Sequence, residues 1–374
     1  MDAFFASVEL LHHPEWRGRP LVVGSGPHER GVVSTCSYEA RKFGVRSAMP
    51  SRTAYQLCPQ AIFTPPNMKL YKRASDEVFE IFSRYTPYVE GVSIDEAYLD
   101  ITGTIHLYGD ARSLGEALRR EVKDRCGLTC SVGIAPNRLL AKMGSESCKP
   151  NGLAVMPFDA DAIARHMRTI PIGAIPGAGK RTVEVLRRYG IATCGDVQRT
   201  PLAELVSILG DAAARSLKDA ALGIGSDEVH WMPSAELSVS REHTFDEDVT
   251  DRETVRAKLL ELVVDVGRRF RRERRWARTA KLKIRDSAFN TFTKQMPFDA
   301  PARDDISFRE RALALFDKTD LKSVRLVGFG VTNIQDSPDD GELSLFAGTD
   351  RERPDRRERL SSALDSLRDK GFNV

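Results

Sequence analysis

Apolar positions follow a helical period in two stretches of the N-terminal half. Strand-like apolar segments surround the second stretch at residues 92–101, 128–134 and 152–156, and a further helix is predicted over 137–147. This order predicts a split βαβ pattern, with helices on one face of a mainly antiparallel sheet. The two helical stretches are marked by Tyr71, Val78, Ile81, Phe82 and Tyr85, and by Leu114, Ala117, Leu118 and Val122.

The pattern changes after residue 160. From about 161 to 225 it indicates short helices punctuated by Gly and Pro, followed by a polar linker near 225–237. Beyond the linker, a helix is expected over 254–270, with strands at 280–284, 290–293 and 324–334. The chain is therefore predicted to be an α+β multidomain protein.

Asp95 and Glu96 place adjacent carboxylates in a stretch that otherwise reads as buried strand. Burying ionised carboxylates is costly, so such a pair indicates nearby cations. Neighbouring strand residues face opposite sides, so the two can converge on one ion site only near a hairpin tip or a bulge. The simpler alternative is a solvated turn between two strands.

Composition sets wider limits. The 374 residues are 29% charged and 41% apolar, which fits two to four domains with ordinary cores. No apolar run approaches a membrane span and no secretory signal opens the chain, so we expect a cytoplasmic protein without a membrane partner. The six cysteines form no CxxC pair and are expected to be reduced thiols.

Charge is unevenly distributed although the net charge is only +3. Residues 268–278 hold seven arginines and one glutamate. The alternative to a functional role is a solvated helix end, but seven arginines exceed what the helix dipole needs. We expect contact with phosphate backbones, through the arginines Arg268, Arg269, Arg271, Arg272, Arg274 and Arg275.

Two further segments suit phosphate binding. If a helix begins near residue 37, Tyr38 and Arg41 share its positive end, with Thr35 just before it; Lys149 could add a charge. The segment 175–180 predicts a glycine hairpin between helices, in which Gly177, Gly179 and Lys180 could approach a phosphate. A tight turn between helices is equally consistent with this segment.

Five motifs in order resemble the Y-family translesion DNA polymerases, within them the bacterial DNA polymerase IV group. The resemblance runs from residue 1 to about 346 and is carried by Met1-Asp2-Ala3-Phe4-Phe5-Ala6-Ser7-Val8-Glu9, by 38–45, by 93–100, by 149–152 and by 175–177. It implies a right-hand polymerase that copies damaged templates with low fidelity. The implied parts are a ferredoxin-like palm at 1–10 and 71–160, small fingers at 11–70, a helix-hairpin-helix thumb at 161–225, a linker at 226–237, an α/β little finger at 238–335, and a flexible tail at 336–374.

The resemblance also implies roles for single residues. Asp95 and Glu96 would hold two Mg²⁺ ions, and Thr35, Tyr38, Arg41 and Lys149 would contact the incoming dNTP. Phe5 would be the steric gate against a ribose 2′-hydroxyl; the alternative is a core aromatic. The protein would act as a monomer on primer–template DNA by two-metal nucleotidyl transfer.

Residues 342–346, Glu-Leu-Ser-Leu-Phe, resemble the peptide by which bacterial polymerases bind the sliding clamp. Leu343, Leu345 and Phe346 would be the anchors, while Glu342 replaces the usual Gln. The alternative is an ordinary apolar patch. A C-terminal amphipathic helix is expected around Leu360, Ala363, Leu364 and Leu367.

The family also has an aspartate, a ligand of both metals, two residues before the position of Asp2, and the sequence begins one residue too late to include it. We expect strongly reduced synthesis from the chain as written, unless Asp2 substitutes from the same strand face. Two alternatives to an active polymerase are a catalytically impaired DNA- and clamp-binding protein and a palm-domain nucleotidyl cyclase. The thumb motif and the arginine-rich unit argue against the cyclase.

Overall fold

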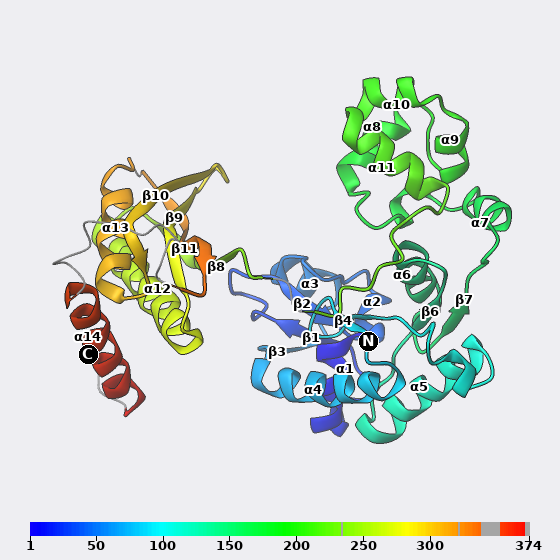
Figure 1. The fold of residues 1–374 in the computed structure, drawn as a ribbon, viewed down its shortest axis with the longest axis horizontal. Helices are drawn as coiled ribbons and strands as arrows, with labels where there is room; N and C mark the ends of the chain where they lie inside the picture. Colours follow the sequence, from blue (N-terminus) through cyan, green and yellow to red (C-terminus); the bar gives the residue numbers. More distant parts are fainter. Residues whose placement is uncertain (233–234, 321, 338–351, 371–374) are drawn as a thin grey trace. The chain divides into compact units, whose positions relative to one another are not determined.

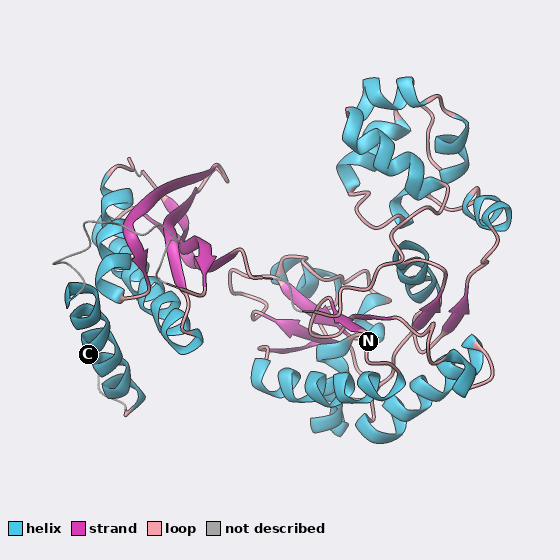
Figure 2. Ribbon diagram, viewed as in Figure 1, coloured by secondary structure: helices cyan, strands magenta, loops and turns pink. Residues whose placement is uncertain are grey.

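The computed structural model describes residues 1–232, 235–320, 322–337 and 352–370. The chain divides into two compact units, unit 1 at Met1–Pro233 and unit 2 at Ser234–Val374. Figures 1 and 2 show unit 1 as mixed helix and strand with a separate group of short helices, and unit 2 as a sheet covered by long helices.

A small three-stranded sheet lies near the start of unit 1. Its central strand β1 (Leu21–Gly24) runs antiparallel to β2 (Val33–Cys36) and parallel to β3 (Ile62–Thr64). Val22, Val33, Cys36, Ala40 and Ala54 form its own small core. The helices of this region are α1 (Phe4–His12), α2 (Tyr38–Arg41) and α3 (Ser51–Leu57).

Two long helices form the base of unit 1, and both were predicted from apolar spacing. Helix α4 (Met68–Tyr85) begins where Asn67 accepts a hydrogen bond from the Leu70 amide at 3.2 Å. Helix α5 (Ala111–Cys126) begins at the Asp110 cap and ends at Gly127 with φ 67°. The helices pack on each other and share one apolar core with α1.

The strands beside these helices form two separate pairs. β4 (Val89–Gly91) and β5 (Ala97–Leu99) are an antiparallel hairpin, while β6 (Val132–Ile134) and β7 (Leu153–Val155) run parallel. The prediction of one mainly antiparallel sheet is therefore wrong in this detail. Residues 1 and 2 bond to segments beside both pairs: the Met1 nitrogen donates to the Asp95 carbonyl at 2.7 Å, and the Asp2 amide donates to the Thr129 carbonyl at 3.1 Å.

Short helices complete unit 1 and pack on α6 (Arg138–Ser147), whose Leu140 and Met143 join their core. Asn137 caps α6 by accepting from the Leu140 amide at 2.9 Å. The polar residues after the last helix still belong to unit 1, since Ser226 accepts from the Arg138 amide. The short helices are α7 (Ala160–Met167), α8 (Lys180–Arg187), α9 (Cys194–Arg199), α10 (Leu202–Leu209) and α11 (Asp211–Ala221).

Unit 2 contains a four-stranded sheet in the order β10-β9-β11-β8. The predicted helix and three strands are present and longer than expected, and two elements were missed: the polar strand β8 and the helix α13. Helices α12 and α13 pack on the sheet, where Leu282, Ile284, Val327 and Phe329 join their core. The bounds are β8 (Ser238–Val249), α12 (Arg252–Glu273), β9 (Trp276–Asp286), β10 (Thr291–Ala302), α13 (Asp305–Asp317) and β11 (Val324–Gln335).

The last described element is α14 (Glu352–Asp369), which packs against α13 (Figure 1). Its Ser361 is only 1% exposed, and the Ser361 hydroxyl accepts from the Asp305 amide at 3.2 Å. The predicted clamp motif at 342–346, with Leu343, Leu345 and Phe346, lies outside the described residues.

Candidate functional site

Asp95 and Glu96 lie at the tip of the β4–β5 hairpin, immediately before β5. The turn is closed by the amides of Val92 and Ser93, which both donate to the Glu96 carbonyl. The Ser93 hydroxyl donates to the Asp95 carboxylate at 2.8 Å and accepts from the Asp95 amide at 3.2 Å. The two residues therefore lie at a hairpin tip, the position at which neighbouring carboxylates can converge on one ion site. Both side chains are half-buried and keep access to solvent.

A chain of alternating charges extends from the hairpin tip onto α6. The Glu96 carboxylate pairs with Lys142, which lies 3.4 Å from Glu146, and Glu146 accepts from Lys149 at 2.7 Å. Burial would lower the pKa of Lys142, but Glu96 and Glu146 outweigh it and the pKa is raised. Burial would likewise raise the pKa of Glu146, but Lys149 and Lys142 hold it below its usual value. Lysine ammonium groups therefore neutralise both carboxylates.

Asp2 is 2% exposed and is held by the protein on every side. One carboxylate oxygen accepts from the Ser131 hydroxyl at 2.7 Å, and the other accepts from the Asn151 amide at 2.8 Å. The Ser7 hydroxyl donates to the Asp2 carbonyl at 2.7 Å. These contacts tie the residue before α1 to the loop that carries Lys149. Among the described residues, no three His, Cys, Asp or Glu side chains gather closely enough to hold a metal ion.

Tyr38, Arg41 and Thr35 lie around the start of α2. Ser37 caps this helix by accepting from the Ala40 amide at 3.3 Å, and the Arg41 guanidinium lies 4.7 Å from the centre of the Tyr38 ring. The Tyr38 hydroxyl is buried without a hydrogen-bond partner among the described residues. Burial, followed by the negative charge of Asp2, raises the pKa of Tyr38, so the hydroxyl remains a donor at neutral pH.

Phe5 stacks on Tyr71 with ring centres 4.2 Å apart and is only partly buried. Tyr71 is fixed in turn, because its hydroxyl donates to the Glu9 carboxylate at 2.5 Å. The Phe5 ring is thus held on a rigid support while one part of it stays accessible. Phe5 is therefore not a wholly buried core aromatic.

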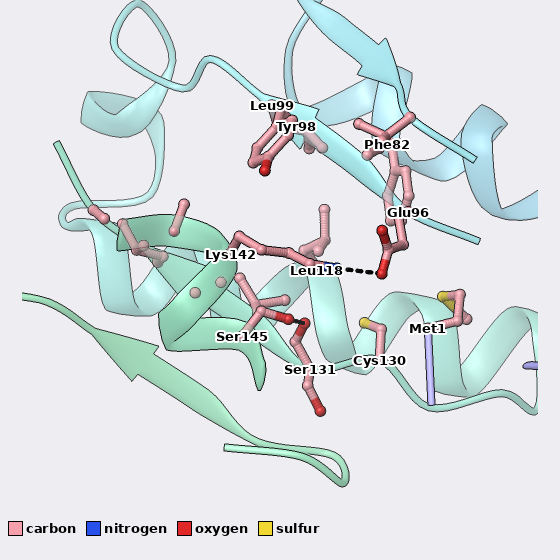
Figure 3. Close-up of a pocket in the computed structure, with 18 of the residues that line it drawn as sticks. Met1, Phe82, Glu96, Tyr98, Leu99, Leu118, Cys130, Ser131, Lys142 and Ser145 are labelled. Atoms are coloured by element: carbon pink, nitrogen blue, oxygen red, sulfur yellow. Dashed lines mark hydrogen bonds and ion pairs between the residues drawn. The ribbon is translucent and has the colours of Figure 1, made fainter. Parts of the chain in front are cut away.

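A cavity of about 290 Å³ separates the hairpin from β6 and α6 (Figure 3). Its walls are mostly apolar, with Phe82, Leu99 and Leu118 among the lining side chains. Lys142 and Glu96 meet at its polar side, where Figure 3 marks their ion pair. Lys149 also lines this cavity, so the charged chain borders a space accessible to small molecules.

The glycine hairpin before α8 presents exposed backbone. Gly177 has φ 90°, which favours glycine, and Gly179 is the residue preceding the helix. No atom lies within 4 Å of a β-carbon built at either glycine, and Lys180 is exposed. The element before the hairpin is a single 3₁₀ turn, Ile172–Ala174, rather than a longer helix.

Several predicted DNA-contacting arginines already have carboxylate partners. Arg269 pairs with Glu236 at 2.8 Å, and Arg275 pairs with the same carboxylate at 3.0 Å. Arg271 is 6% exposed and pairs with Asp305 at 2.5 Å. In contrast, Arg272 is 70% exposed in its side chain, and Arg274 is also exposed. The cluster is therefore not one free basic surface.

A second basic surface, which the sequence did not reveal, lies on the sheet face opposite the helices. We call it the open sheet face: residues Ser238, Ser240, Lys281, Lys283, Thr293 and Thr332 line a hollow of about 280 Å³ there. A β-carbon at Gly328 would lie 2.8 Å from Glu242, and one at Gly330 would lie 2.7 Å from Ser240. Because these two glycines of β11 have no side chain, the side chains of Glu242 and Ser240 from β8 can lie over them.

Lys142 and Glu146 were also missed. Their i, i+4 spacing on a predicted helix was visible in the sequence, but only the fold brings Lys142 to Glu96 from 46 residues away. Among the described helices, none has the length and apolar character needed to cross a membrane.

Comparisons with known proteins agree along the chain. Residues 1–146 match the impB/mucB/samB family, and residues 236–345 match the C-terminal domain of that family. DNA polymerase IV of Exiguobacterium sibiricum is 37% identical, over 90% of this chain and 93% of its own length. DNA polymerase IV of Methanoculleus marisnigri is 38% identical, with 90% and 93% covered.

Solved structures give the same result. A Y-family DNA polymerase chimera, Dbh-Dpo4(243-245)-Dbh, superposes with a TM-score of 0.78 at 27% identity, covering 89% of this chain and 97% of the chimera. The insertion ternary complex of Dbh DNA polymerase superposes with a TM-score of 0.64 at 27% identity and the same coverage.

Proposed function

The chain belongs to the impB/mucB/samB family of Y-family DNA polymerases and is a DNA-directed DNA polymerase of the DNA polymerase IV group; from that premise we propose that the β4–β5 hairpin tip is its catalytic centre. The observation that carries the proposal is the convergence of Asp95, Glu96 and Lys149 on one solvent-accessible cavity. Carboxylates for cations and ammonium groups for phosphates therefore border one space.

Y-family polymerases generally depend on divalent metal ions, and the residues at the hairpin tip fit Mg²⁺. Mg²⁺ is usually bound by one or two carboxylates together with substrate phosphates, and Asp95 and Glu96 supply such a pair. Lys142 now holds a positive charge against Glu96, in the position where a cation is needed. We propose two Mg²⁺ ions here; when bound, they lower the pKa of the primer 3′-hydroxyl and neutralise charge on the attacked phosphate.

The remaining residues bind and orient the dNTP. Lys149 and Arg41 offer charged donors to the triphosphate, and the unpartnered Tyr38 hydroxyl offers a third donor that a phosphate oxygen would satisfy. Thr35, just before α2, adds a fourth polar contact. Phe5, braced by Tyr71, excludes the ribose 2′-hydroxyl by its bulk. When Glu96 binds a cation and releases Lys142, the ion pair with Glu146 keeps Lys142 beside the site.

DNA contact falls to two surfaces in this proposal. The backbone amides around Gly177, Gly179 and Lys180 approach phosphates without reading bases. In unit 2 the open sheet face offers Lys281 together with serine and threonine hydroxyls, and Lys283, which pairs with Glu242 at 2.8 Å, lies beside them. Both surfaces would bind the sugar–phosphate backbone, so DNA binding would not depend on the template sequence.

Primer extension tests this assignment on the full chain. The D95N and E96Q variants are expected to lose dNTP incorporation while their affinity for primer–template DNA stays within about two-fold. The matched control is D76N, on the exposed outer face of α4, which should incorporate dNTPs like the parent chain. If the parent chain binds DNA but incorporates nothing, the alternative of a catalytically impaired DNA- and clamp-binding protein gains support.

Two finer assignments have separate tests. The F5A variant should incorporate ribonucleotides at least about ten-fold more readily relative to dNTPs, because the ring that excludes the 2′-hydroxyl is gone. We also propose that residues 342–346 bind the bacterial sliding clamp while the polymerase itself is a monomer. The variant L345A/F346A should lose clamp binding in surface plasmon resonance and keep its affinity for DNA.

A further inference from the structure

Unit 2 has a basic hollow that the proposed polymerase function does not use. It has a volume of about 520 Å³ and lies where the helix α12 meets the edge strand β8. Four guanidinium groups face two carboxylates around it. The lining residues are Arg241, Arg268, Arg269, Arg272, Asp265 and Glu273. Arg241 has no ion-pair partner among the described residues, and the side chain of Arg272 is mostly exposed although Asp369 lies 3.8 Å away. The guanidinium groups in the lining outnumber its carboxylates, and the remaining positive charge is offset by carboxylates from outside the hollow.

The C-terminal helix α14 sends two carboxylates to this end of α12. Asp369 pairs with Arg268 and lies 3.8 Å from Arg272, and Asp365 lies 3.6 Å from Arg268. The two arginines are four residues apart on α12, and the two aspartates are four residues apart on α14. Each helix therefore presents its charges one turn apart, and the two rows face each other.

Polar contacts hold α14 in place. The Ser361 hydroxyl bonds to the Asp305 amide, Glu358 pairs with Arg303, and Arg357 pairs with Glu310 at 3.2 Å. Two of its leucines contribute little apolar contact, since Leu360 is 52% exposed and Leu367 is 38% exposed, while Leu364 is half-buried. An attachment built from ion pairs weakens as salt rises, and a polyanion can compete for the same arginines.

If α14 departed, the most buried arginine beside it would keep a carboxylate partner, although Arg303 would lose Glu358. Arg271, which is almost fully buried, would lose Asp365 but keep Asp305 at 2.5 Å. Arg268 and Arg272 would be freed at the surface, where water or phosphate oxygens can solvate them. The arginines released are thus the ones that border the hollow.

We propose that this hollow is a further binding surface for the phosphodiester backbone of DNA, and that α14 is its built-in competitor, with Asp365 and Asp369 pairing with Arg268 and Arg272 until DNA displaces them. The surface lies on the helical side of unit 2, away from the open sheet face. DNA bound there would be held without any reading of bases, because guanidinium–phosphate contacts carry no sequence information.

Binding of a fluorescent 20-base-pair duplex to the full chain, measured across a salt series, tests the proposal. D365N/D369N should bind roughly three- to ten-fold more tightly than the parent, and the slope of log K against log salt should steepen by up to about 1.8 for two added phosphates. Adding R268Q/R272Q to that variant should cancel both changes. An unchanged affinity and slope would overturn the proposal.

A matched control separates this site from general charge effects. E247Q/D320N removes two exposed carboxylates of unit 2 for which no ion pair is recorded among the described residues, so it adds the same charge elsewhere. Equal tightening by this variant would contradict a specific site. A second measurement needs no variant: in the parent chain, saturating duplex should increase hydrogen exchange of the amides at 356–369. Unchanged exchange there would show that DNA leaves α14 docked, even if the polymerase assignment holds.

Discussion

Two ion-pair networks, one in each unit, differ in the cation that neutralises the carboxylate and in how deeply that cation is buried. In unit 1, Glu96 at the hairpin tip is neutralised by one flexible lysine, Lys142, and both side chains are about one-third exposed. In unit 2, Asp305 is held by the almost fully buried guanidinium of Arg271, with Asp365 on its other side. In the first network a metal ion can replace Lys142 beside Glu96. In the second network Asp305 and Asp365 already occupy the guanidinium of Arg271.

The chemistry of the cations explains this difference. An ammonium group is a compact charge on a flexible stem, so a metal ion can take its place without disturbing the fold. A guanidinium donates through a rigid planar fork and loses several oriented hydrogen bonds when its partner leaves. Of these two networks, the loose one therefore lies at the candidate site, and the buried one is architectural.

The largest expected effect comes from removing the loosely held carboxylates. D95N or E96Q should lower kcat for dNTP incorporation by about 10³-fold or more, because cation binding at the attacked phosphate is worth several kcal/mol. Single-turnover extension measures this loss. Thermal unfolding should change little, since the pair is half-exposed. A variant with a lowered unfolding temperature and normal dNTP incorporation would contradict this expectation, because the carboxylates would then be structural.

Removing the guanidinium of the closed network should damage the fold. R271M is expected to reduce the free energy of unfolding of unit 2 by about 3 kcal/mol, because Asp305 and Asp365 would be left with Arg368 as their nearest remaining cation. Denaturant unfolding followed by circular dichroism measures it. R272M is the control, because the exposed Arg272 should contribute less than about 0.5 kcal/mol.

The corresponding change in unit 1 should be mild. K142M is expected to cost less than about 1 kcal/mol of unfolding free energy, because exposed ion pairs contribute little and water can solvate Glu96. The same denaturant experiment measures it. A cost as large as that of R271M would mean that Lys142 is architectural, and the contrast between the two networks would fail.

The smallest expected effect depends on pH. Because Lys149 and Lys142 hold the pKa of Glu146 below its ordinary value of 4.5, the ionised carboxylate stabilises the fold above that pH. This contribution should disappear as pH falls through the lowered pKa. The unfolding free energies of the parent and E146Q should differ by less than about 0.5 kcal/mol at pH 7 and converge near pH 3. E116Q, an exposed control on α5, should show no such convergence.

Local pattern was sufficient for much of the fold. The helices α4, α5, α6 and α12 follow directly from apolar spacing, and residues such as Asn67 and Asp110 cap them as their side chains allow. The strand β8 was missed because Ser238–Val249 is an edge strand with mostly exposed positions, which leaves little alternation to detect. Helix α13 was missed in the same half of the chain.

The candidate site divides in the same way. Motif order pointed to Asp95, Glu96, Tyr38 and Lys149, because short segments preserve a chemical role in their own residues. The Glu96–Lys142 pair and the positioning of Asp2 by Ser131 join residues 46 and 129 positions apart, so no local pattern contains them. The arginine cluster shows the limit most clearly: its charge was evident, but its carboxylate partners were not.

The sequence by itself determined the helices, the polymerase family and the residues that could carry its chemistry, since periodicity, capping and motifs are local properties. Only the tertiary structure decided which of those charges stay available. Arg271 is closed by Asp305 and Asp365, 34 and 94 residues away, while Glu96 keeps a replaceable lysine at an open cavity. The physical reason is that the strength of an ion pair depends on burial and geometry, and the folded chain sets both.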